Sequence, residues 1–398
     1  LIALASQKHP PLRASVRATG NGRISRSIRG RSVARAAAPP GGVSIASGSK
    51  RKGGIALVTG ATRGIGKGIA VGLGELGMKV YITGRTVSPS DNAPRADGVG
   101  GSLVETKELV EAAGGICEYA SVDSSDDDAL QNLIQRIEKE DGKLDVLVNN
   151  AYGAVDTLGE TMGTPFWEKP PTIWDDINKV GLRSHYVTTC LAAPLLLKSA
   201  EEKSDPPPLV VHVSSLGGLT YVFDVAYGIG KDAVDRMAGD MAVELTPKGV
   251  AVCSLWPGVV KTEKMASLIK TTDGRIGTLD DAESPIFVGR AVAALACADD
   301  LLTKRSGTVQ PVEDLATQFQ FTDEDGKVPP SFRSLKGLAA TAPQFVKDLL
   351  PNGLKMPWWL LKMVVKPMPR FSKPMINPNA GPSSSSSKKL NEQQSKTA

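Results

Sequence analysis

Short apolar runs alternate with longer segments of helical period from about residue 53 to residue 310. Several of the runs are nearly continuous in Val, Ile and Leu, which is typical of strands buried on both faces of a sheet. We predict strands at 55–58, 79–83, 117–122, 146–148, 209–213 and 250–255. The intervening segments predict helices at 66–76, 103–113, 127–139, 174–199 and 226–245.

The regular succession of strand and helix predicts an α/β fold with a doubly wound parallel sheet of the Rossmann type. The 398 residues are 41% hydrophobic and 22% charged. This suits one catalytic domain of about 250 to 300 residues with appendages. We expect a basic leader at 1–52, the catalytic domain at 53–314, a helical C-terminal extension at 315–375 and a disordered, low-complexity tail at 376–398.

Positive charge is concentrated in the leader. Residues 1–52 hold eleven of the 47 Lys and Arg residues and no acidic residue, which leaves 36 basic and 42 acidic residues in the remainder. The remainder therefore lacks the excess of basic residues that is typical of nucleic-acid-binding proteins. The leader is rich in Arg, Ser and Ala and has no apolar core of the kind found in secretory signal peptides. This composition favours a plastid or mitochondrial transit peptide, and the alternative is a disordered basic tail without a targeting function.

Metal chemistry has little support in the composition. The four cysteines are scattered without a C-x-x-C pair, and the chain holds three histidines. The pattern favours free thiols in a reducing compartment and argues against structural zinc, so we expect no metal site.

A glycine turn follows the first predicted strand and opens the first predicted helix. Its sequence from Thr59 is TGATRGIG. Glycines let backbone amides at a helix N-terminus approach a pyrophosphate closely. We therefore predict a dinucleotide site, with contacts from Gly60, Arg63, Gly64, Ile65 and Gly66.

The charges near this turn favour NADPH. The second predicted strand leads to Gly84-Arg85, where an NAD site would place an Asp or Glu on the ribose hydroxyls. Arg85 and Arg63 suit a 2′-phosphate because guanidinium groups bind oxyanions and stay charged. The alternative is a pair of solvated surface arginines.

A Tyr-x-x-x-Lys pair lies in the predicted helix 226–245. Its members, Tyr227 and Lys231, share one helix face because they are four residues apart. The positive charge is expected to lower the phenol pKa, and such a tyrosine exchanges a proton with a carbonyl oxygen at neutral pH. Beside a bound dinucleotide, the pair predicts hydride transfer to or from a carbonyl.

Seven motifs occur in order over about residues 54–310. They are TGATRGIG, Val122-Asp123, Asn149-Asn150-Ala151, Asn178-x-x-Gly181, Ser214-Ser215, Tyr227-x-x-x-Lys231 and Pro257-Gly258-x-x-x-Thr262. In this combination the chain resembles the short-chain dehydrogenase/reductase superfamily. The stretches 174–186 and 254–258 resemble one branch of it with bacterial members, and this resemblance extends into the C-terminal region.

The resemblance implies catalytic roles. Tyr227 would be the general acid, and Lys231 would lower its pKa and bind the nicotinamide ribose. Asn178 would interrupt a helix and hold a water near Lys231 as part of a proton relay. The catalytic serine could be Ser214 or Ser215. Ser214 has the spacing to Tyr227 that is commonest in the family, but we favour Ser215 from the local sequence pattern.

The resemblance also implies cofactor contacts and an assembly. Asp123 would bond the adenine amino group, and Asn150 would line the inner ribose, while Asn149 braces the central strand. The nicotinamide carboxamide would be covered by Pro257, Gly258 and Thr262. Relatives are commonly dimers or tetramers, which implies a homo-oligomer.

Two departures from the family bear on the substrate. Tyr152 replaces the usual glycine after Ala151, and a long loop to Lys169 adds Phe166 and Trp167 near the expected mouth of the site. We expect a mobile substrate lid at 265–287. These features favour a bulky apolar carbonyl such as a steroid, a quinone or an aromatic ketone, the alternative being aromatics in an oligomer contact.

The apolar segment 356–366 in the C-terminal extension is too short to span a bilayer. Its tryptophans and flanking lysines predict either a peripheral membrane contact or a helix packed on the domain or a second subunit. The family branch would place the protein at the endoplasmic reticulum membrane, in competition with the organelle suggested by the leader.

We therefore expect an NADPH-dependent carbonyl reductase acting on a small-molecule carbonyl. The alternative is a non-catalytic NADPH-binding module with a regulatory or scaffolding role.

Overall fold

The computed structural model describes residues 50–88, 99–161, 164–271, 279, 281–331 and 355–357. The transit-peptide prediction concerns residues that lie almost wholly outside these ranges, as do most of the segment 356–366 and the predicted tail.

Seven parallel strands form one sheet within the described residues. In spatial order they are β3 (Ile116–Ser121), β2 (Lys79–Gly84), β1 (Ile55–Val58), β4 (Val146–Asn149), β5 (Leu209–Val213), β6 (Ala251–Trp256) and β7 (Val309–Pro311). Every residue of β1, β4, β5 and β6 is buried, as expected of strands covered on both faces. The predicted doubly wound parallel sheet is confirmed.

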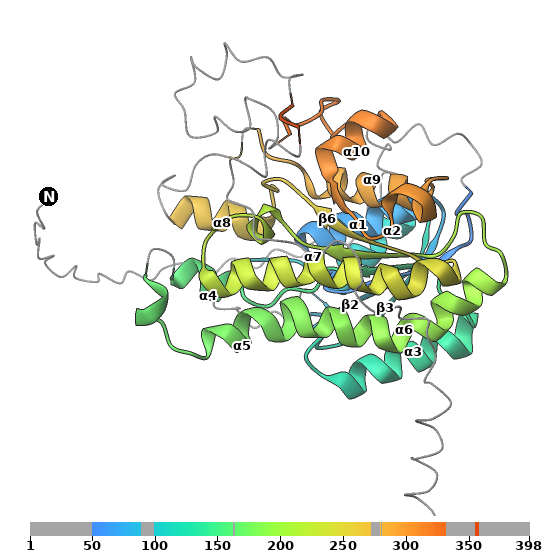
Figure 1. Cartoon of the computed structure of the whole chain (residues 1–398), viewed down its shortest axis with the longest axis horizontal. Coiled ribbons are helices and arrows are strands. Elements are labelled where there is room, and N and C mark those ends of the chain that lie inside the picture. Colours follow the sequence, from blue (N-terminus) through green and yellow to red (C-terminus); the bar gives the residue numbers. More distant parts are fainter. Residues whose placement is uncertain are drawn as a thin grey trace, which may run out of the picture. The chain divides into compact units, whose positions relative to one another are not determined.

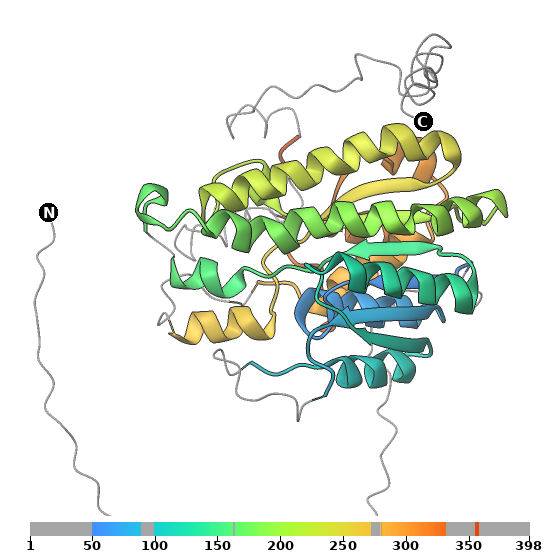
Figure 2. The ribbon, with the colours of Figure 1, turned by 90° about the horizontal axis from the view of Figure 1, so that it is seen from below.

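Two layers of helices cover the sheet. Figure 1 shows α3 (Asp127–Asp141), α6 (Ser184–Glu201) and α7 (Val225–Leu245) on one face, and α1 (Gly64–Glu75), α2 (Leu103–Ala112) and α9 (Pro285–Ala296) on the other. Figure 2 shows the long helices α6 and α7 running side by side. Side-chain caps from Ser102, Asp126, Asp224 and Ser284 satisfy backbone amides at four of these helix starts.

The predicted helix 174–199 is three elements. It divides into α5 (Ile173–Asn178), a π-helical turn η3 (Lys179–Arg183) and α6. The loop before it contains α4 (Val155–Glu160) and a short 3₁₀ turn, η2 (Phe166–Glu168). A π-helical turn changes the phase of the helix, so that residues before and after it face different neighbours.

The expected lid at 265–287 is too long at its C-terminal end. The segment begins in α8 (Glu263–Thr271), but Pro285 starts α9, and Phe287 is fully buried against Phe321. Helix α9 is buried along nearly its whole length, so it lacks the amphipathic period that predicts a helix. Residues 272–278 and 280 lie outside the described residues.

Residues on the outer side of both expected domain boundaries pack against the catalytic domain. Arg51, expected in the leader, is buried, and its guanidinium donates to the carbonyls of Ala296 (2.7 Å) and Pro207 (2.5 Å). The expected boundary after residue 314 cuts through α10 (Val312–Phe319), in which Leu315 and Ala316 belong to the core. Along the part of the chain that the structure describes, no helix is long and apolar enough to cross a bilayer.

Candidate active site

The carboxyl ends of the central strands lie at one edge of the sheet. The register pairs Val58 with Val148, Val148 with Val211 and Val213 with Leu255. The glycine turn, the Asn149-Asn150-Ala151 triplet, the serine pair and the Pro257-Gly258 turn therefore follow directly at this edge. In open α/β sheets this edge is where ligands bind.

Hydrogen bonds join the glycine turn to the Asn149-Asn150-Ala151 triplet. Asn150 Nδ2 donates to the carbonyls of Thr59 (2.9 Å) and Gly60 (3.0 Å). Gly60 has a φ of +68°, and a Cβ there would lie 2.7 Å from Ala151 Cα. A side chain at Gly60 is therefore excluded both by the left-handed backbone and by the neighbouring strand end.

A carboxylate already lies at the N-terminus of α1. Glu263, the first residue of α8, accepts a hydrogen bond from the Gly64 amide at 2.9 Å and pairs with the Lys67 ammonium. Thr262 lies against Gly64. Sequence reasoning missed Glu263, and the only local signal was an acidic residue directly after Thr262. Its position marks the start of α1 as a site that holds an anion.

The predicted adenine-end residues are accessible. Arg85 is exposed after β2, whereas Arg63 is half-buried and donates to the Val99 carbonyl at 3.0 Å. Asp123 accepts from the Ser125 amide at 2.9 Å, and this bond, assisted by the charge of Arg85, lowers the pKa of its carboxyl group. Ile65 is half-buried and packs on the core.

Tyr227 and Ser215 are in direct contact. Their hydroxyl oxygens lie 2.8 Å apart, and Ser215 Oγ also accepts from the Gly217 amide. Ser214 Oγ instead donates to the Lys231 carbonyl at 3.1 Å and is buried. The structure therefore places Ser215 beside the phenol and gives Ser214 a backbone contact.

Lys231 lies one turn after Tyr227 and is buried. Its ammonium donates to the Val213 carbonyl at 3.1 Å. Burial lowers the pKa of Lys231 to about 8, against the opposing effect of Asp235. Asp235 in turn accepts from Ser254 and Trp256, which ties α7 to β6.

The expected fall in the Tyr227 pKa is not found. Burial raises the pKa of this phenol, the hydrogen bond with Ser215 lowers it, and Asp235 raises it. Desolvation disfavours a tyrosinate, and the four-residue spacing of Tyr227 and Lys231 does not show how deeply the phenol is buried. Tyr227 is consequently a protonated phenol at neutral pH.

Asn178 ends α5 and faces α7. Its Nδ2 lies 3.5 Å from the Ala226 carbonyl, and a Cβ on Gly230 would lie 2.1 Å from its Oδ1. Gly230 therefore allows the Asn178 amide to lie against the helix that carries Tyr227 and Lys231. The interrupted helix expected at this position is present as η3.

Tyr152 packs against the catalytic candidates. Its ring meets that of Tyr227 edge-on, with centroids 6.2 Å apart, and lies in a small apolar cluster with residues of α4, α5 and α7. Phe223 makes a second edge-on contact with Tyr227 at 5.3 Å. Two aromatic rings thus frame the phenol that carries the proton.

Three buried polar side chains brace the strand ends. Asn149 Nδ2 donates to Thr189 at 2.8 Å and lies 3.3 Å from His212 Nδ1. His185 bonds the Ala151 carbonyl and stacks on His212. Burial lowers the pKa of both imidazoles, to about 4 for His212, so they are neutral at pH 7.

A buried pair of carboxyl groups lies behind the Pro257-Gly258 turn. The backbone of Glu283 pairs with Val259 and Lys261 on this turn. Glu283 and Glu313 are each 2% exposed, and a Cβ on Gly258 would lie 2.9 Å and 3.1 Å from one oxygen of each. Burial, then the charge of Glu313, raises the pKa of Glu283 well above its ordinary value.

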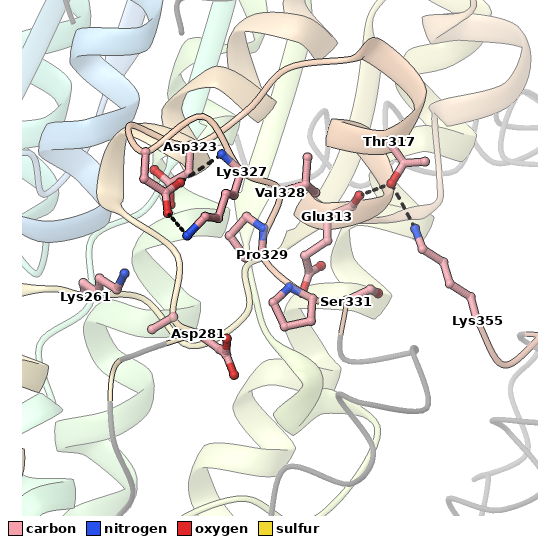
Figure 3. Close-up of a pocket in the computed structure, with 13 residues that line it drawn as sticks. Lys261, Asp281, Glu313, Thr317, Asp323, Lys327, Val328, Pro329, Ser331 and Lys355 are labelled. Atoms are coloured by element: carbon pink, nitrogen blue, oxygen red, sulfur yellow. Dashed lines mark hydrogen bonds and ion pairs between the residues drawn. The ribbon is translucent and has the colours of Figure 1, made fainter. Parts of the chain in front are cut away.

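A separate cavity of about 370 Å³ lies beyond this turn (Figure 3). It is lined by mixed charges, among them Lys261, Asp281, Glu313, Asp323, Lys327 and Lys355. Neither Tyr227 nor Lys231 lines it, so the cavity is distinct from the catalytic candidates. Within the described ranges, no group of three or more His, Cys, Asp or Glu side chains is placed to hold a metal ion.

Comparison with known proteins gives a consistent result. A sequence model described as short chain dehydrogenase matches residues 54–273. The protein Dehydrogenase/reductase SDR family member 1 of Mus musculus is 38% identical over 312 residues, covering 75% of this chain and 93% of that protein. Its Homo sapiens counterpart is 36% identical over 315 residues with the same coverage.

The fold also occurs in solved structures. A solved structure described as a dehydrogenase from Xanthomonas campestris has a TM-score of 0.57 and 22% sequence identity, covering 70% of this chain and 93% of its own.

Proposed function

Because this chain belongs to the short-chain dehydrogenase/reductase family, whose members are NAD(P)-dependent oxidoreductases, we propose that it is an NADPH-dependent reductase of ketones or aldehydes. The observation that carries the proposal is the 2.8 Å contact between the hydroxyls of Ser215 and Tyr227, with Lys231 one turn later. The contact lies at the strand edge that also carries the glycine turn.

The residues present fit a dinucleotide. The start of α1 holds the Glu263 carboxylate through the Gly64 amide, so an anionic pyrophosphate has a donor in the same place. Arg85 is exposed directly after β2, Arg63 is half-buried in the glycine turn, and no acidic residue directly follows β2. These charges favour a 2′-phosphate and hence NADPH.

Tyr227 is proposed as the general acid. Bound NADPH would supply the hydride for the carbonyl carbon. The phenol, which burial keeps protonated, donates its proton to the carbonyl oxygen, and Ser215 steadies that oxygen by a hydrogen bond. We propose that Lys231, which donates to the Val213 carbonyl, and Asn178, which contacts the Ala226 carbonyl, take part in returning a proton to Tyr227.

A bulky apolar carbonyl suits the surroundings of Tyr227. Phe223 is 40% exposed, and its ring packs edge-on against the ring of Tyr227. Phe166 and Trp167, expected from the sequence near the mouth of the site, are 58% and 72% exposed and pack against each other. Exposed aromatic side chains beside a site favour an apolar ligand. We propose a steroid, quinone or aromatic ketone as the substrate class.

The test is a measurement of NADPH consumption, followed by the loss of its absorbance, with a panel of such carbonyls. The parent chain is expected to turn over at least one of them, and Tyr227→Phe is expected to lose this activity while it still binds NADPH. Tight NADPH binding with no turnover across the panel would instead support a non-catalytic binding module.

Association and location remain proposals from the sequence. A homo-oligomer is tested by light scattering of the purified chain. An organelle address for 1–52, or a membrane surface contact through 356–366, is tested by imaging the tagged full chain and a variant that lacks 356–366.

A further inference from the structure

Tyr152 is held in place from two sides. On one side, a Cβ placed on Gly181 in η3 would lie 2.6 Å from Cδ2 and Cε2 of its ring, so the ring lies against the bare backbone of this turn. On the other side, the ring packs edge-on against Tyr227, with an interplanar angle of 86°. The ring therefore has a defined position beside α7.

The face of this ring is turned toward a buried cation. Lys231 Nζ lies 4.9 Å from the Tyr152 centroid, closer than its 5.9 Å from the centroid of Tyr227. Lys231 is 8% exposed, and its ammonium donates to the neutral carbonyl of Val213. A ring face attracts an ammonium more strongly when water is excluded.

The phenol oxygen of Tyr152 contributes little to this arrangement. It is buried and has no hydrogen-bond partner among the described residues. A buried hydroxyl without a partner is a cost to the folded state. The aromatic face, and not the hydroxyl, is thus the part of Tyr152 that acts on its surroundings.

We propose that Tyr152 is a positioning residue that holds the ammonium of Lys231 with its aromatic face. Its contribution to turnover rests on the proposed function, because it acts through Lys231. The contact itself is a property of the folded chain. It favours the charged amine at a place where burial disfavours charge, and it keeps Nζ on the Val213 side of α7.

The other charges around Lys231 are unchanged by a substitution at Tyr152. Asp235 and the Tyr227 phenol face the amine from α7, and His185 on α6 is a neutral imidazole because burial lowers its pKa. The buried ion pair of Lys169 with Asp224 lies at the start of α7. A change in the titration of Lys231 can therefore be assigned to the ring.

The direct test measures the Lys231 amine without cofactor. Competitive acetylation over a range of pH, with mass spectrometry of the Lys231 peptide, gives its titration midpoint. Tyr152→Phe keeps the ring face and is expected to leave the midpoint unchanged. Tyr152→Leu removes it and is expected to lower the midpoint by roughly 0.5 to 1 unit, because the charged form loses an attraction.

A matched control separates this effect from lost packing. Leu158→Ala alters the same apolar cluster from α4 and is expected to reduce thermal stability without moving the Lys231 midpoint. Tyr152→Met serves as the second non-aromatic variant if Tyr152→Leu does not fold. An unchanged midpoint in the folded non-aromatic variants, or an equal shift in Tyr152→Phe, overturns the proposal.

Turnover provides the second readout. In Tyr152→Leu we expect kcat at pH 7 to fall about three- to tenfold with a small change in carbonyl KM, and Tyr152→Phe to stay near the parent. Absence of NADPH turnover in the parent would reject the proposed function, while the labelling result would still decide the contact between Tyr152 and Lys231.

Discussion

At the scale of single residues, adjacent side chains of the same type have different hydrogen-bond partners. Ser214 and Ser215 are neighbours in sequence, yet Ser215 reaches the Tyr227 hydroxyl and Ser214 reaches the Lys231 backbone. Successive residues leaving a strand point to opposite sides, so one serine faces the ligand edge and the other faces the helix. The interval along the sequence could not distinguish them, because it does not specify the length of the loop that follows.

The serine pair gives a matched experiment. Ser215→Ala is expected to lower kcat/KM for the best carbonyl about 100-fold, because a donor to the developing alkoxide is removed. Ser214→Ala is expected to retain most activity and to lose about 1 kcal/mol of unfolding free energy, through the lost bond to Lys231. Steady-state kinetics and chemical unfolding of both variants decide the assignment, and a greater kinetic loss in Ser214→Ala would reverse it.

Arg85 provides a test of cofactor choice. Replacing this exposed guanidinium by alanine is expected to raise the Kd for NADPH about 10- to 100-fold and to leave the Kd for NADH nearly unchanged. Nucleotide fluorescence measures both constants. Equal weakening of the two cofactors would mean that Arg85 does not read the 2′-phosphate.

At the scale of elements, the first turn of α8 competes with a ligand for the start of α1. Glu263 accepts from the Gly64 amide and pairs with Lys67, so a dinucleotide that uses this helix end must displace a carboxylate. Glu263→Gln is therefore expected to lower the Kd for NADPH about three- to tenfold. Glu138→Gln removes the same charge from the exposed surface of α3 and is the control. Weaker binding in Glu263→Gln would contradict the competition.

The carboxyl pair behind the Pro257-Gly258 turn links element packing to pH. The folded-state pKa of Glu283 is raised, so the folded protein retains a proton that the unfolded chain loses above its ordinary pKa near 4.5. The contribution of this group to stability therefore falls as pH rises from that value toward the folded-state pKa. Glu283→Gln is expected to be more stable than the parent at pH 7, with the difference vanishing below about pH 4. Unfolding midpoints measured at both pH values decide this, and a constant difference would exclude ionisation as its cause.

Local pattern explains which elements the sequence predicts well. The predicted strands at 55–58 and 209–213 match β1 and β5, and the remaining ones are within about one residue of their strands. Helix α9 was missed because it is buried on nearly all sides and so lacks an alternation of polar and apolar faces. Strand β7 was missed because three residues are too few to show a period. The contacts of Glu263 with Gly64 and of Glu283 with Glu313 join distant parts of the chain, so no local spacing could reveal them.

At the scale of the whole molecule, the catalytic fold begins earlier than its first strand. Arg51, which precedes β1, donates to carbonyls at the end of α9 and in the loop before β5, and it is nearly fully buried. Burial lowers its pKa, although an arginine remains charged. Two carbonyls at separate places in the fold thus depend on a residue that composition assigns to the leader.

Two truncations test this boundary. A chain that starts at residue 50 is expected to unfold at the same temperature as the full chain. One that starts at residue 53 is expected to lose about 2 kcal/mol, because two buried carbonyls lose a charged donor. Arg51→Met in the full chain should reproduce the loss, whereas Lys52→Ala, at an exposed position, should not. Equal melting temperatures for the two truncations would place the start of the folded domain after Arg51. Calorimetry of the full chain, the two truncations and the two point variants distinguishes these outcomes.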